Sequence, residues 1–96
     1  SPPLPRPPSM DDQEFIQNMQ KRIEDSAGVA ITLELDNDQR EDIDVFFSGE
    51  KPRVVIGADA LVQAGLARMF MQFAILCLKE GRKVEQEEFL RFLRRN

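Results

Sequence analysis

The sequence predicts an α+β domain with a small, mainly antiparallel sheet of two to three strands and helices on one face of that sheet. Two observations support this prediction. Two segments between residues 29 and 48 alternate apolar and polar residues with a period of two, which is typical of strands with one solvated face. Three other segments space their apolar residues as amphipathic helices do. The predicted order is helix, strand, strand, short strand, helix, helix.

The length of the chain predicts one domain behind a proline-rich lead. The chain has 96 residues, and chains of this size hold one hydrophobic core. Residues 1–9, SPPLPRPPS, contain all but one of the prolines, so they favour disorder or extended polyproline II backbone. The PPLP motif resembles ligands of WW and SH3 domains; the alternatives are a linker or a remnant of a longer chain. Residues 10–96 are expected to form the domain.

The first helix is expected from about Asp11 to Asp25. Ser9 and Asp12 fit a capping box at its start, and Gly28 follows it as a stop signal. Acidic residues in the first turn favour the positive end of the helix dipole. The apolar side chains that share one face of this helix are Phe15, Ile16, Met19 and Ile23.

The two alternating segments, VAITLELD and DIDVFFSG, predict an antiparallel hairpin joined by the polar connection NDQRE. Phe46 is the one apolar residue that falls on the outer face of this hairpin. Gly49 and Pro52 mark a turn, and RVVIG is then a short third strand. The inward-facing residues of the two longer strands are Val29, Ile31, Leu33, Leu35, Ile43, Val45 and Phe47.

A long helix is expected from Ala60 to Lys79, with Gly65 allowing another element to approach closely. The apolar stretch at 61–78 approaches the length of a membrane span, but Arg68 and two glutamines within it oppose that interpretation. We therefore expect a core helix that ends at Gly81. The last helix has acidic residues at its start and basic residues at its end: Glu85, Glu87, Glu88, Arg91, Arg94 and Arg95.

The composition argues against several kinds of chemistry. The chain has no histidine, which removes the usual general base, the Ser-His and Cys-His pairs and most zinc sites. The single cysteine, Cys77, lies in an apolar run and is predicted to be a buried thiol. Without an intrachain disulfide, the cytoplasm or another reducing compartment is favoured. An EF-hand loop beginning at Asp36 fails at Glu41 and Phe47. We expect no enzyme, no cofactor and no metal site.

One segment, FFSGEKPRVVIGADALVQAGLARMF, resembles the central part of a KH domain of the kind fused to other RNA-binding modules in bacteria. In that family a strand ends in Ser-Gly-Glu, and an apolar Ile-Gly then enters the GxxG loop. Here the corresponding residues are 48–50, Ile56 and Gly57. The resemblance covers about half of the chain, and it implies a KH-like fold that contacts single-stranded RNA through Lys51, Arg53 and Gly57.

The chain departs from that family in the loop itself. Ala60 replaces the second glycine, and Ala58 and Asp59 stand where KH domains usually have a basic residue. Such loops bring backbone N–H groups close to phosphates. The carboxylate of Asp59 would repel a phosphate, and we expect it to cap the following helix instead.

The sequence therefore predicts a non-catalytic protein-interaction module, such as an adaptor, assembly or regulatory domain, that binds another protein or forms a homodimer. The long apolar helix carries more apolar surface than so small a domain covers easily. The alternative is single-stranded RNA binding, which the net charge of −4 opposes. Neither a membrane nor a metal is an expected partner. The candidate residues for partner contact are Phe46, Phe70, Met71 and Phe73.

Overall fold

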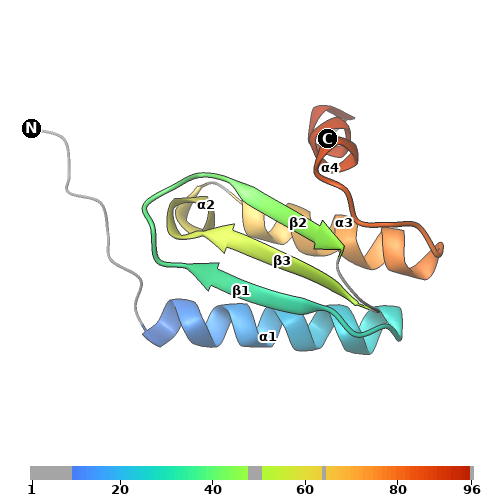
Figure 1. The fold of residues 1–96 in the computed structure, drawn as a ribbon, viewed down its shortest axis with the longest axis horizontal. Coiled ribbons are helices and arrows are strands. Elements are labelled where there is room, and N and C mark those ends of the chain that lie inside the picture. Colours follow the sequence, from blue (N-terminus) through green and yellow to red (C-terminus); the bar gives the residue numbers. More distant parts are fainter. Residues whose placement is uncertain (1–9, 48–50, 64, 96) are drawn as a thin grey trace, which may run out of the picture.

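The computed structural model describes residues 10–47, 51–63 and 65–95, and it shows a three-stranded sheet with helices along one face (Figure 1). The α+β class and the broad order of elements are confirmed. The predictions for the lead at 1–9 and for the turn at 48–50 fall outside the described residues. The helices and strands are α1 Met10–Ala27, β1 Thr32–Asp36, β2 Ile43–Phe47, β3 Pro52–Gly57, α2 Ala58–Val62, α3 Leu66–Lys79 and α4 Gln86–Arg95.

The sheet is mixed, with the strand order β1-β3-β2. Val54 of β3 lies opposite Leu33 in a parallel pairing with β1 and opposite Val45 in an antiparallel pairing with β2. The predicted hairpin between the first two strands is therefore wrong, because the third strand lies between them. The reason is burial: β3 exposes only Arg53, whereas β1 and β2 each have accessible residues on their outer face, such as Glu34 and Phe46. Strands buried on both faces take central positions.

The hydrophobic core lies between the inner face of the sheet and helices α1 and α3. These two helices run in the same direction along the sheet (Figure 1). Helix α4 closes the end of the core, where Phe89 packs edge-to-face against Phe70 with ring centroids 5.3 Å apart. Val29 is 40% exposed, contrary to the prediction, because β1 begins only at Thr32. The fully buried core side chains include Ile23, Ile31, Val54, Ile56, Phe70 and Val84.

The predicted single helix from Ala60 to Lys79 is two helices. The backbone is extended at Gln63, and Gly65 adopts a left-handed conformation with φ of 78°. A Cβ atom on Gly65 would meet nothing within 4 Å, so this glycine provides a positive φ and not the close approach we predicted. None of the helices in the described ranges is both long and apolar enough to cross a membrane.

The C-terminal end of α3 and the charge order of α4 agree with the sequence predictions. Helix α3 stops just before Gly81, where the Arg82 N–H donates to the Cys77 carbonyl over 2.8 Å. Cys77 is buried, as predicted, and this burial raises the pKa of its thiol. Helix α4 carries its acidic residues in the first turn and its basic residues in the last.

Candidate functional site

The corner after β3 is closed by the connection between β1 and β2. The Gly57 N–H donates to the Asp42 carbonyl over 2.9 Å, and the Asp59 N–H donates to the Arg40 carbonyl over 3.1 Å. A Cβ atom on Gly57 would overlap the Arg40 carbonyl group, which explains why glycine stands there. The predicted capping by the Asp59 carboxylate is wrong, since α2 has no side-chain cap. Both amides are nevertheless occupied.

The outer face of the sheet neutralises its own charges. Arg53 donates to the Glu34 carboxylate through Nη2 over 2.8 Å and through Nε over 3.1 Å. Its guanidinium also lies 5.5 Å from the ring centre of Phe46. The hydrogen bond from Arg53 lowers the pKa of Glu34 and raises the pKa of Arg53. Two of the predicted functional residues, Phe46 and Arg53, are therefore paired with each other.

A second arginine ties the two edge strands together. Arg40 donates to Asp36 at the end of β1 over 2.9 Å and to Asp44 of β2 over 2.6 Å. The hydrogen bond to Asp44 is the largest cause of the raised pKa of Arg40. This side chain passes over Gly57, so one arginine holds three strands in place at this corner.

The edge of β1 that faces away from β3 is covered by side chains of α1. The Leu33 N–H donates to Gln20 Oε1 over 2.9 Å, and the Ile31 N–H lies 3.4 Å from Glu24 Oε1. Gln20 also donates to Glu24 over 3.0 Å, which fixes both side chains. An edge whose amide groups are satisfied in this way is a poor template for an added strand.

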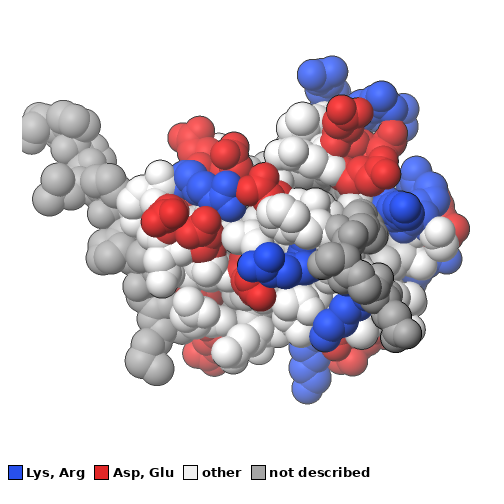
Figure 2. All heavy atoms as spheres, in the orientation of Figure 1, with Lys and Arg blue, Asp and Glu red and all other residues white. Residues whose placement is uncertain are grey.

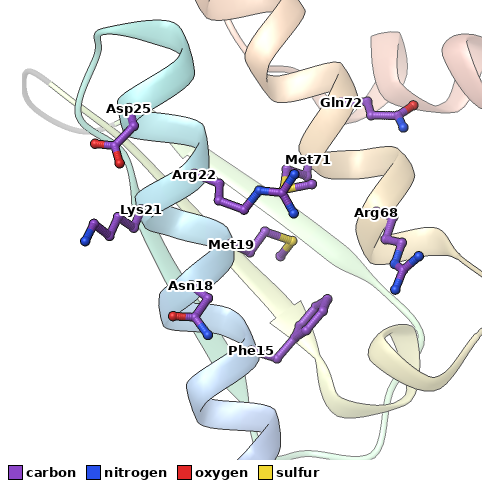
Figure 3. A pocket seen from close by; sticks show the side chains of 9 residues that line it. All are labelled: Phe15, Asn18, Met19, Lys21, Arg22, Asp25, Arg68, Met71 and Gln72. Carbon is purple, nitrogen blue, oxygen red and sulfur yellow. The ribbon is translucent and has the colours of Figure 1, made fainter.

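A groove of about 810 Å³ lies between α1 and α3, on the side of these helices away from the sheet (Figure 3). Its apolar lining comes from Phe15 and Met19 of α1 and from Met71 of α3. Phe15 is 40% exposed, Met71 is half-buried, and Met19 is also part of the core. The charged side chains that line the groove are Lys21, Arg22, Asp25 and Arg68.

The groove cations differ from those of the sheet. Within residues 10–47, 51–63 and 65–95, none of Lys21, Arg22 and Arg68 forms an ion pair. The described lining of the groove thus has three cations against the single anion Asp25, in a chain whose net charge is −4. A surface with an excess of cations that form no ion pair in the described part of the chain is suited to binding an acidic group from another molecule.

The residues predicted from the sequence fall in different parts of the structure. Phe70 and Phe73 are 0% and 3% exposed, so a partner could reach neither side chain in the folded domain. Met71 lies in the groove and Phe46 on the outer sheet face. Of the residues proposed for RNA, Lys51 is exposed, Arg53 is paired and the Gly57 amide is occupied.

Of the residues that line the groove, only Met71 is predicted from the sequence as a contact residue; those it misses include Phe15, Arg22 and Arg68. Phe15 was assigned to the apolar face of α1, yet it stands next to Ile16, which is 2% exposed. Two adjacent residues point about 100° apart on a helix, so both cannot face the sheet equally. This extra width of the apolar face is the signal that could have revealed the groove.

No family model, curated protein or solved structure matches this chain. Nowhere in the described ranges do three or more Cys, Asp or Glu side chains gather in a way that could hold a metal ion.

Proposed function

We propose that this chain is a non-catalytic protein-interaction module, an adaptor, assembly or regulatory domain, that binds its partner through the groove between α1 and α3. The observation that supports this proposal is an apolar floor flanked by arginines that form no ion pair within the described part of the chain. Interfaces commonly combine a buried apolar centre with charged side chains that steer and orient the partner.

A second copy of the chain is a less suitable occupant of this groove. A dimer with two-fold symmetry brings the same patch of each protomer together. Such a dimer would place Arg22 and Arg68 against the same arginines of the partner protomer. Juxtaposed like charges oppose association. We therefore favour a different protein over a homodimer through this surface.

The alternative function, single-stranded RNA binding, would use Lys51, Arg53 and Gly57. It has less support, because the amide of Gly57 donates to Asp42 and the guanidinium of Arg53 is held by Glu34. A phosphate would have to displace both interactions. The acidic net charge of the chain also disfavours a polyanion.

The proposal is tested by capturing partners from an extract of the cells that encode the chain, with three baits. The first is the parent chain, the second carries Arg22→Glu with Arg68→Glu, and the third carries Arg94→Glu with Arg95→Glu as a control of equal charge change on α4. Quantitative mass spectrometry should find a partner that the parent and the control retain and that the groove variant loses. Equal recovery of every protein by all three baits would refute the groove as an interface.

A further inference from the structure

The two walls of the groove each contribute an arginine. Arg22 extends from α1 toward Met71, and Arg68 projects from α3 near the end of the groove that Phe15 occupies (Figure 3). A segment that lies between the two helices would therefore meet a cation on either side. Carboxylates on both flanks of an incoming segment would match this arrangement.

The floor of the groove accepts apolar side chains of more than one shape. Met71 is half-buried on the α3 wall, and the ring of Phe15 is 40% exposed on the α1 wall, whereas Met19 is 2% exposed and belongs to the core. Methionine is unbranched and polarizable, so it adapts to side chains of different outlines. An amphipathic helix that lays its apolar ridge between two helices is a common way to bury such a floor.

The side chains that enter the groove carry positive charge. Figure 3 shows Lys21 and Asp25 pointing away from α3, whereas Arg22 extends toward Met71 and Arg68 projects near Phe15.

We infer that the partner presents an acidic amphipathic helix, an inference that rests on the proposed function. The apolar ridge of this helix contacts the exposed parts of Phe15 and Met71. Glutamates or aspartates on both sides of the ridge pair with Arg22 and Arg68. Exposed ion pairs contribute modestly, so burial of the ridge supplies most of the affinity and the charges select the partner and its orientation.

The probe for this inference is a fluorescein-labelled helical peptide with a leucine ridge flanked by glutamates, measured by fluorescence anisotropy against the full chain. Two matched peptides replace the glutamates with glutamine or with lysine, and a labelled oligouridine tests nucleic acid. We expect the glutamate peptide to bind at least about tenfold more tightly than the glutamine peptide, and binding to weaken as salt increases.

Chain variants then assign the binding to the groove. Arg22→Glu with Arg68→Glu should weaken the affinity for the glutamate peptide by about tenfold or more. Arg94→Glu with Arg95→Glu should change this affinity by less than about threefold. Circular dichroism of each variant verifies that the fold is retained. Equal binding of the glutamine peptide would overturn the inference, because the groove would then select on apolar contact alone.

The remaining outcomes separate this inference from the proposed function. If no peptide binds while the extract experiment returns a groove-dependent protein, the acidic helix is wrong and the interaction module stands. If neither experiment shows groove-dependent binding, both the proposed function and the acidic-helix inference are refuted. If oligouridine binds more tightly than the peptides and is lost in the groove variant, the groove is a nucleic-acid surface and both proposals are overturned.

Discussion

The outer face of the sheet and the groove between α1 and α3 both place arginine beside an exposed aromatic ring, but the two surfaces use their arginines differently. On the sheet, Arg53 stacks on Phe46 and donates to Glu34. In the groove, Arg68 projects near Phe15 and Arg22 extends toward Met71, and neither forms an ion pair in the described part of the chain. In Figure 2, basic and acidic side chains are interspersed on the side of the molecule where the sheet faces the viewer.

The difference shows which arginines are available to another molecule. An arginine that already donates to a carboxylate loses that interaction when it binds a ligand, so its net contribution to binding is small. An arginine without such a partner gains the whole interaction. We therefore assign the sheet face a structural role and the groove the role of contact surface, and four predictions test this division in order of decreasing effect.

The largest effect is expected from Phe70→Ala, which tests whether this residue belongs to the core and not to a contact surface. Phe70 is fully buried and packs edge-on against Phe89, so its removal should cost about 3–5 kcal/mol of unfolding free energy. Phe46→Ala on the outer face is the control and should cost about 1 kcal/mol. Urea denaturation measures both. Similar losses for the two variants would contradict the assignment of Phe70 to the core.

The next effect concerns the corner where Gly57 passes beneath Arg40. Gly57→Ala places a methyl group on the Arg40 carbonyl, and this clash with backbone should cost about 2 kcal/mol or more. Thermal unfolding followed by circular dichroism measures the loss. As a control, Gly65→Ala has open space around it and should cost about 1 kcal/mol, through its positive φ alone. A Gly57→Ala protein as stable as the parent would mean that the segment between β1 and β2 moves away from the added methyl group at no cost in stability.

The third prediction compares a paired arginine with an unpaired one directly. Arg40→Gln leaves Asp36 and Asp44 without their shared cation and should lower the unfolding free energy measurably. Arg22→Gln in the groove should change the unfolding free energy by less than about 0.5 kcal/mol, since it breaks no ion pair. Urea denaturation measures the unfolding free energy of both variants and of the parent. A larger loss for Arg22→Gln would show that the groove arginine stabilises the fold.

The smallest effect is a pH dependence on the sheet face. Because the pKa of Glu34 is lowered in the folded chain, its pairing with Arg53 stabilises the fold above the ordinary pKa of 4.5. This stabilisation is lost as the pH falls through the lowered value. An NMR titration should show the Glu34 carboxyl titrating below 4.5 in the parent and near the ordinary value in Arg53→Gln. Identical midpoints in the two proteins would show that the ion pair does not persist in solution.

The sequence alone determined the elements whose signal is local. The spacing of apolar residues defined α1 and α4, strict alternation defined most of β1 and β2, and the apolar neighbours of Cys77 predicted its burial. Each of these signals fits within one or two turns of helix or a few residues of strand. Local periodicity reports which side of an element faces the core, so it can be read without knowing what the element packs against.

Only the tertiary structure decided the strand order and the contrast between the two surfaces. Which strand lies at the centre depends on pairing between distant segments, and β3 entered between β1 and β2 because both of its faces could be buried. Arg53 forms an ion pair with Glu34, which is 19 residues away in the sequence. Arg22 and Arg68 line a groove between two helices and form no ion pair in the described ranges. An arginine looks the same in a sequence in either case, because its partner is set by the neighbours that folding supplies.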